Sequence, residues 1–204
     1  VQALPTIGAA AEPALTPLLQ LLPKADPETR ARVLGVFAGI GAKAKAALPE
    51  VQNHLKDSDP GVRAAALAAF AKIEEPAARV SILLAGLDDT ALPVRKTAAL
   101  ELAALGDRSR DATSRLTALL QHDDERDFAF DALRQISPRS VPDLITMLKD
   151  RDLAVQVFAT QRLAKLGPDA RDAIPALEAV LQRRERSELK NSVTEALKRI
   201  NPKP

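Results

Sequence analysis

Basic residues recur along this chain at nearly constant spacing, and they are the residues whose type and spacing could do chemistry. They are Arg30, Arg63, Arg95 and Arg126, and Gln156 and Lys190 follow at the same register. A row of guanidinium groups can bind anions, so one interpretation is an anion-binding track. However, a cation in the first turn of a helix opposes the helix dipole, and acids such as Asp57 and Asp89 recur in the preceding turns. We therefore interpret the four arginines as a structural ladder that pairs with carboxylates of the chain itself.

The histidines offer a second kind of chemistry, metal binding. His54 and His122 are the only two, and His122 opens the run His-Asp-Asp-Glu at residues 122–125. Imidazole and carboxylate groups are metal ligands, but this run lacks a second His-Glu pair to complete a site. A turn whose acidic residues cap a helix is the simpler interpretation. We expect no metal site.

Catalytic motifs are missing from the sequence. Serine and lysine occur without a nucleophile elbow, a phosphate loop or a paired base. The absence of cysteine excludes disulfides, thiolate metal sites and cysteine nucleophiles together. We therefore predict no catalytic residue, no cofactor and no enzyme activity.

The composition does not indicate which kind of partner the chain binds. The 204 residues are 46% hydrophobic and 27% charged, with a formal net charge of +2. That balance supports neither a nucleic-acid nor a membrane interaction, and the apolar runs are too short to span a bilayer. The sequence leaves the oligomeric state and the compartment open, with the cytoplasm as the default.

Two apolar series with the same period reveal how the chain is organised. One series is Ile7, Ile40, Ile73, Leu105, Ile136, Leu166 and Ile200. The other lies three residues ahead of it, at Leu4, Phe37, Phe70, Leu102, Leu133, Leu163 and Leu197. A period of 30–34 residues is typical of a solenoid, in which each unit buries its apolar face against its neighbours.

The repeat at residues 47–73 shows how one unit is built. Its first helix has a one-sided apolar stripe at Leu48, Val51 and Leu55. A turn follows, in which Asp59 can cap the second helix and Pro60 can take its first position. Asp26 and Asp152 stand at equivalent places and are predicted to be caps as well. The pattern predicts two antiparallel helices per repeat and no strand.

Several of these residues resemble the HEAT-like repeat family, in its short phycobilisome-lyase type. The resemblance is carried by the Ala-Leu-Pro opening at 47–49, the Asp-Pro-Gly-Val-Arg turn at 59–63 and the closing Ile-Gly at 40–41. It implies an all-α fold, a right-handed α-α superhelix. We count about six helical hairpins in a single domain over 1–204, which we expect to be the C-terminal part of a larger protein. The repeats are 14–40, 47–73, 78–105, 111–136, 140–166 and 173–200, with residues 1–8 as the remnant of a preceding repeat.

The fourth and fifth repeats depart from the pattern. Leu120 lies six residues before Arg126, whereas the equivalent Leu55 lies eight before Arg63. The junction from Ile136 to Val141 is also shortened. We expect the superhelix to change curvature around 121–142. Phe130 is the one aromatic residue whose register places it near the inner edge, although core packing is the default for every Phe.

The inner surface of such a superhelix is the expected binding surface. Positions opposite the core stripe of the second helices give the candidates Ala68, Ala71, Leu100, Asp131, Arg134, Gln161 and Lys198. The first three belong to an almost uncharged half, and the others to a mixed-charge half. The alternative interpretation is that small residues there merely permit tight curvature.

These patterns predict a non-catalytic interaction scaffold that binds a protein or peptide partner on its concave surface. Two alternatives stay open. One is a solenoid that binds nucleic acid or phosphate through the ladder arginines, which the charge balance and the lack of Trp and Tyr argue against. The other is an accessory or lyase-like enzyme subunit.

Overall fold

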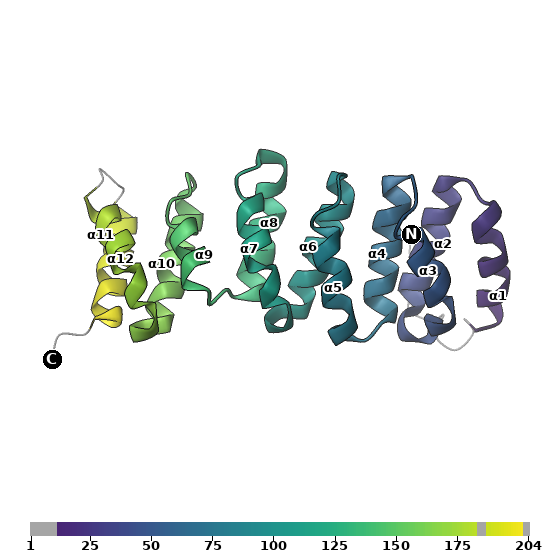
Figure 1. The fold of residues 1–204 in the computed structure, drawn as a ribbon, viewed down its shortest axis with the longest axis horizontal. Helices are drawn as coiled ribbons and strands as arrows, with labels where there is room; N and C mark the ends of the chain where they lie inside the picture. Colours follow the sequence, from purple (N-terminus) through teal and green to yellow (C-terminus); the bar gives the residue numbers. More distant parts are fainter. Residues whose placement is uncertain (1–11, 183–186, 202–204) are drawn as a thin grey trace. The chain divides into compact units, whose positions relative to one another are not determined.

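The computed structural model describes residues 12–182 and 187–201, which form helices and the turns between them (Figure 1). No strand occurs in these described ranges, so the predicted all-α class is confirmed. The chain divides into two compact units, Val1–Arg108 and Ser109–Pro204, and each is described by itself. The proposed repeat remnant at 1–8 lies outside the described residues.

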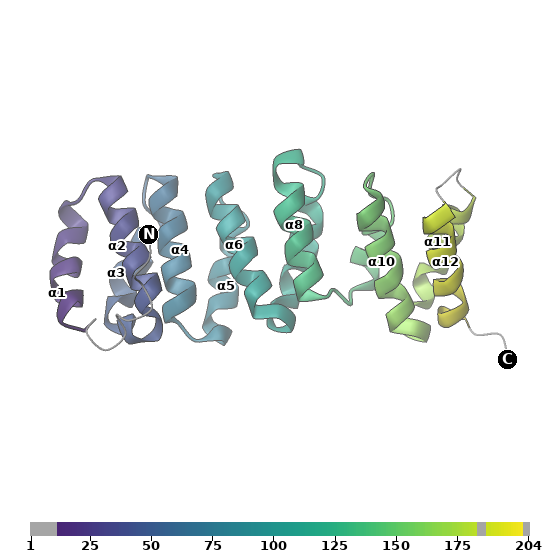
Figure 2. The same cartoon turned by 180° about the vertical axis from the view of Figure 1, so that it is seen from behind.

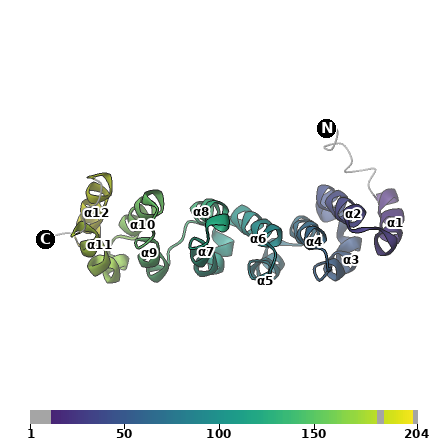
Figure 3. The same cartoon turned by 90° about the horizontal axis from the view of Figure 1, so that it is seen from above.

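The first unit contains three helical hairpins in two layers. They pair α1 (Glu12–Leu21) with α2 (Pro27–Ile40), α3 (Leu48–His54) with α4 (Pro60–Ile73), and α5 (Pro76–Gly86) with α6 (Leu92–Leu105). The second helices pack side by side, α2 against α4 and α4 against α6. Figure 3 shows α3 and α5 on one side of this row. The second helices of this unit therefore form one continuous row.

The second unit repeats the arrangement of helical hairpins. It pairs α7 (Thr113–Leu119) with α8 (Asp123–Ile136), α9 (Val141–Met147) with α10 (Leu153–Leu166), and α11 (Ile174–Leu181) with α12 (Ser187–Ile200). Seen from behind in Figure 2, the ribbons of α8, α10 and α12 face the viewer. α12 packs along α10, but α8 and α10 have no comparably extensive contact.

The junctions between hairpins differ in how they are built. After α2 and α10 the chain turns at Gly41 (φ 66°) and Gly167 (φ 57°), and each glycine begins a seven-residue 3-10 helix. The left-handed side of φ favours glycine because it has no Cβ. These segments, η2 (Gly41–Ala47) and η4 (Gly167–Ala173), pack against the second helices on both sides of the junction. They act as spacers between successive hairpins.

The junction after α8 has no such spacer. Ser137 takes the left-handed position (φ 56°), and residues 137–140 form no 3-10 helix before α9. Arg162 of α10 instead reaches back, and its Nη2 lies 3.4 Å from the Ser137 carbonyl oxygen. The sequence indicated this short junction. The change of curvature inferred from it stays a prediction. The junction after α4 is also without a 3-10 helix, since only Glu74 and Glu75 separate α4 from α5, and there α4 and α6 still pack closely.

The core follows the periodic series. Phe37, Phe70, Leu102, Leu133 and Leu163, one from each of five second helices, are at most 3% exposed. Fully burying one such side chain stabilises the fold by about 1.5–3 kcal/mol. The middle position of the second helix is also buried, as Ala66 illustrates with no exposed surface, so helices of one hairpin can approach closely.

Substitution by alanine at two glycines of the first unit should have opposite effects on the free energy of unfolding. A Cβ at Gly86 would lie 2.7 Å from Leu67 Cδ2 and 3.0 Å from Ala98 Cβ, whereas one at Gly39 would meet nothing within 4 Å. We expect Gly86→Ala to destabilise by about 1–3 kcal/mol through overpacking. Gly39→Ala should stabilise by about 0.4–1 kcal/mol by restricting the unfolded chain. Urea unfolding of both variants checks the packing between α4, α5 and α6, and equal effects would contradict it.

Candidate binding site

The ladder arginines reach from one hairpin to the turn of the next. Arg63, in the first turn of α4, forms a bidentate pair with Asp89, with Nε and Nη2 each 2.9 Å from a carboxylate oxygen. Its Nη1 donates to the carbonyl oxygens of Asp57 (2.8 Å) and Ser58 (3.2 Å) in its own turn. One side chain therefore joins two consecutive turns.

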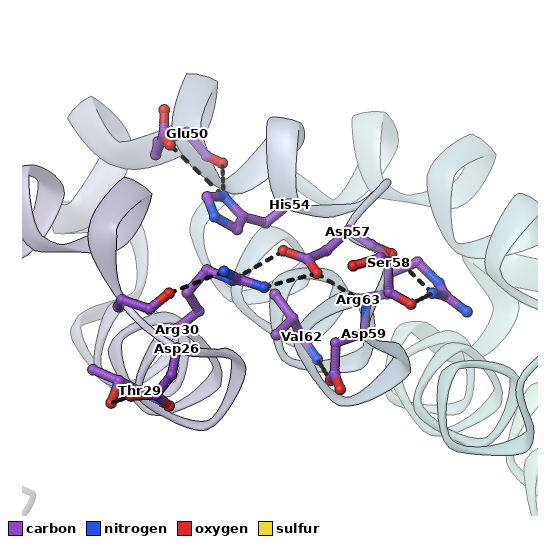
Figure 4. Close-up of polar contacts among 11 residues, drawn as sticks. Asp26, Thr29, Arg30, Glu50, His54, Asp57, Ser58, Asp59, Val62 and Arg63 are labelled. Atoms are coloured by element: carbon purple, nitrogen blue, oxygen red, sulfur yellow. Dashed lines mark hydrogen bonds and ion pairs between the residues drawn. The ribbon is translucent and has the colours of Figure 1, made fainter.

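The same geometry recurs at other arginines of the ladder. Arg30 Nε and Nη2 lie 3.1 and 3.2 Å from the two Asp57 carboxylate oxygens, and its Nη1 donates to the Ala25 carbonyl oxygen (Figure 4). In the second unit, Arg126 Nη1 lies 2.6 Å from Asp150 Oδ1. Arg95 Nη1 donates to the carbonyl oxygen of Asp89 (2.8 Å), which lies in the turn before its own helix.

The aspartates of these pairs are held by their own turns. Asp57, Asp89 and Asp150 each accept, through Oδ1, a hydrogen bond from the backbone N–H two residues further on, at 2.8–2.9 Å. This bond fixes the carboxylate before the arginine reaches it. Gln156 takes the place of the arginine in α10, and its side-chain amide donates to the Asp150 carbonyl oxygen (2.8 Å). In this repeat the hydrogen bond within the turn is therefore made by an uncharged side chain.

The predicted caps lie at the starts of the second helices. Asp26 accepts from the Thr29 N–H (2.9 Å), Asp59 from the Val62 N–H (3.0 Å) and Asp152 from the Ala154 N–H (2.7 Å). The hydrogen bonds from Thr29 hold the pKa of Asp26 below its usual value. Each cap satisfies a backbone donor that the helix itself cannot satisfy.

The pKa shifts of Arg63 and Asp89 agree with this pairing. The hydrogen bond from Arg63 lowers the pKa of Asp89, against the opposing effect of burial, and the Ala91 N–H lowers it further. The same hydrogen bond raises the pKa of Arg63. The side chains of Arg30, Arg63 and Arg126 are only 13–19% exposed. Guanidinium groups that are paired and largely covered have little capacity left for an external anion.

The histidines do not come together with acids as a metal site. His54 is buried, and its Nδ1 lies 2.9 Å from the Glu50 carbonyl oxygen. His122 is exposed at the N-cap of α8 without a capping bond from its side chain. Within residues 12–182 and 187–201 no group of three or more His, Cys, Asp or Glu is placed to hold a metal ion.

The predicted inner surface of the first unit needs one correction. Leu100 is 50% exposed on α6, and Ala68 is partly exposed on α4. Ala71, predicted to be exposed, is only 1% exposed. The reason is that α4 lies between α2 and α6, which cover its flanks. Ala71 is therefore a packing residue and is removed from the candidate site.

A cleft of about 560 Å³ also lies in the first unit, between the hairpins of α3/α4 and α5/α6. Leu67, Ile82 and Val94 contribute apolar lining. Of its charged residues, Arg63 and Asp89 neutralise each other, and Lys56 makes no ion pair with any described residue. The lining therefore offers a single uncompensated charge.

The second unit has a cleft between α8 and α10 on the second-helix side. It encloses about 540 Å³, and we call it the α8–α10 cleft. Its lining is Phe130, Arg134, Asp152, Leu153, Ala154, Val157, Phe158 and Gln161. The volume lies in the range of ligand pockets in proteins. Two of the predicted residues, Arg134 and Gln161, are thus brought together, whereas Asp131 and Lys198 are exposed outside this lining.

Aromatic residues form the middle of the α8–α10 cleft. The rings of Phe130 and Phe158 meet edge to face, with centroids 5.6 Å apart. The Arg134 guanidinium carbon lies 6.0 Å from the Phe130 centroid, within reach of a cation–π interaction. Sequence analysis placed Phe130 near the inner edge and left core packing as the default for Phe158.

One partner of the ladder was also missed. Asp150, which binds Arg126, was not among the predicted acids, although it stands two residues before the cap Asp152 just as Asp57 stands two before Asp59. That spacing would have identified it.

Comparison with known proteins agrees with the fold. A sequence model described as HEAT repeats matches residues 15–91 and 126–198, most of the chain. No curated protein matches the sequence significantly. Among the described helices, none is both long and apolar enough to cross a membrane.

Designed repeat proteins are among the similar solved structures. Computationally designed armadillo repeat proteins for modular peptide recognition align with a TM-score of 0.58 and 21% identity, over 92% of this chain and 100% of theirs. A designed armadillo repeat protein in complex with the peptide (KR)4 gives 0.56 and 22%, over 92% and 99%. A chain of the phycocyanin lyase complex of Nostoc sp. gives 20% identity, over 91% and 98%, but a TM-score of only 0.35. The first two likenesses show a helical-repeat solenoid fold, and the lyase-type subdivision stays a prediction.

The pair between Arg63 and Asp89 predicts a specific loss of stability. Arg63→Ala leaves a partly buried carboxylate without its partner, so we expect the free energy of unfolding to fall by about 1–3 kcal/mol. Arg32→Ala is the matched control, because Arg32 pairs with Glu28 on the surface, where both side chains are about three quarters exposed. That variant should change stability by less than about 0.5 kcal/mol. Equal effects in urea unfolding would contradict the structural assignment.

Acid should remove the contribution of the same pair. Because the folded-state pKa of Asp89 is lowered, its stabilising effect is present above the unfolded pKa of about 3.9 and is lost as the pH falls through the folded-state value. Asp89→Asn should therefore be less stable than wild type at pH 5–7. The difference should shrink as the pH falls below about 4. Urea unfolding across pH 2.5–7 measures it, and a difference independent of pH would refute the pairing.

Proposed function

The chain belongs to the HEAT repeat family, and we propose that it is a non-catalytic scaffold that binds a polypeptide partner on the face formed by its second helices. The observation that carries the proposal is the α8–α10 cleft, in which exposed polar groups surround an aromatic centre. Clefts with an apolar centre and a few polar groups are the usual form of a binding site.

Further support comes from the composition of the second-helix face. It presents an exposed apolar residue, Leu100, in the first unit and exposed charges at Asp131, Arg134 and Lys198 in the second. Apolar anchors supply affinity in protein interfaces, whereas exposed charges mainly steer association. The solved structures that resemble this chain include designed peptide-binding repeat proteins, which makes a peptide partner consistent with the fold.

The rival function of anion or nucleic-acid binding is weakened by the ladder geometry. That function needs arginines that are exposed and unpaired, but Arg30, Arg63 and Arg126 are paired with aspartates and largely covered. Described residues also lack a cluster of metal ligands, and no observation favours catalysis by this chain.

Selection from a peptide library tests the proposal. A random peptide library displayed on phage is selected against the chain, and the best peptide is measured by fluorescence anisotropy. If the second-helix face binds the peptide, Arg134→Glu should weaken a peptide bound by the second unit, or slow its association, at least about threefold. Leu100→Glu should do the same for a peptide bound by the first unit. The Ala68→Glu variant should fold and should also bind the peptide more weakly than wild type.

The controls are matched substitutions on other surfaces. Ser81→Glu introduces the same charge on α5, and Lys149→Glu reverses a charge after α9, both at exposed positions. These variants should bind the peptide within about twofold of wild type. Wild-type affinity in all three second-helix variants, or failure to select any peptide, would overturn the proposal.

A further inference from the structure

The α8–α10 cleft has unlike charges at its two ends. Asp152 lies at the start of α10 and Gln161 nine residues further along it, a separation of about 13 Å along the helix axis. Arg134, eleven residues into α8, belongs to the Gln161 end, because the second helices of successive hairpins run the same way. Between them lie Phe130 and Phe158. The cleft is thus acidic at one end, aromatic in the middle and basic at the other end.

Both charges are available to a ligand. Arg134 is exposed, and its interaction with the Phe130 ring is a contact with a neutral group. It makes no ion pair with any residue that the structure describes. Asp152 is also exposed, and its Oδ1 accepts a hydrogen bond from Ala154 N–H. It forms no ion pair with any described residue, because the neighbouring Arg151 pairs with Asp123 and Arg126 with Asp150. Of the other acids of α8, Asp127 and Asp131 do not line the cleft.

The length of the cleft fits a short extended segment. A peptide in extended conformation advances about 3.3 Å per residue and alternates its side chains between two faces, so residues 1, 3 and 5 of a segment share one face and span about 13 Å. We propose that the α8–α10 cleft binds an extended five-residue segment whose first, third and fifth side chains face it: a basic side chain at the Asp152 end, an apolar side chain over Phe130 and Phe158, and a carboxylate at the Arg134 end. This inference rests on the proposed function and names the chemistry of the partner segment.

The two phenylalanines define what the middle residue must be. Their rings are partly exposed, and Val157 beside them is partly exposed too. A Leu or Phe side chain of a ligand would bury this apolar surface and gain affinity. The amide of Gln161, exposed next to Arg134, can donate a second hydrogen bond to the ligand carboxylate.

Three pentapeptides that differ only in their charges test the proposal. They are Ac-Lys-Ser-Phe-Ser-Glu-NH2, Ac-Lys-Ser-Phe-Ser-Lys-NH2 and Ac-Glu-Ser-Phe-Ser-Glu-NH2, titrated into the isotopically labelled full chain and followed by NMR. The Lys/Glu peptide should bind about two- to fivefold more tightly than either like-charged peptide, which is the range of an exposed ion pair. The largest shifts should fall on the amides of Val157, Phe158 and Gln161.

Two variants should change this preference in opposite ways. Arg134→Gln should remove the advantage of the Lys/Glu peptide over the Lys/Lys peptide and keep its advantage over the Glu/Glu peptide. Asp152→Asn keeps a capping side chain on α10 and should do the reverse. Lys198→Gln, at an exposed position of α12 outside the cleft, should change neither preference.

The outcomes separate this inference from the proposed function. Equal binding of the three peptides by wild type, an unchanged preference in both variants, shifts away from the cleft, or no binding at all would each overturn it. If a library-selected peptide still loses affinity with Arg134→Glu while the pentapeptides show no charge preference, the second-helix face remains the binding surface and only the charge pattern proposed for its ligand is wrong.

Discussion

The ion pair between an arginine in one hairpin and an aspartate in the next turn is the interaction on which the repeat architecture depends. A helix begins with unsatisfied N–H groups, and its dipole disfavours a cation there. In this chain the cation is tolerated because its guanidinium group spans two turns, binding carbonyl oxygens of its own turn and the carboxylate of the next. The Asp89 carboxylate, in turn, is oriented by the Ala91 N–H. Each pair therefore fixes both the turn and the position of the next hairpin.

This pairing decides which surface is left for binding. The arginines that recur most regularly in the sequence form ion pairs within the protein. Regular spacing of a charged residue therefore does not identify the binding site. The α8–α10 cleft arises where the repeat is least regular. There the turn before α8 and the junction before α9 are both shortened, and α8 and α10 leave aromatic surface between them. The proposed binding site rests on this surface.

Much of the fold could be predicted because its causes are local. Periodic burial of Phe37, Phe70 and Leu102, and capping by Asp26 and Asp59, depend on residues within one hairpin. The errors concern contacts between hairpins. Ala71 was predicted to be exposed because its register was judged against its own hairpin, whereas the neighbouring second helices cover it. Phe158 does contact Phe130 of the neighbouring hairpin, but the cleft around this pair depends on the exact path of residues 137–140, which spacing alone does not give.

The central claim is that the ladder arginines serve the structure by coupling successive hairpins. The most direct measurement is a double-mutant cycle on Arg63 and Asp89, in which urea unfolding of wild type, both single alanine variants and the double variant gives their coupling free energy. The structure predicts a favourable coupling of at least about 1 kcal/mol, as expected for a bidentate, partly buried pair. Additive effects of the two substitutions, with no coupling, would contradict it.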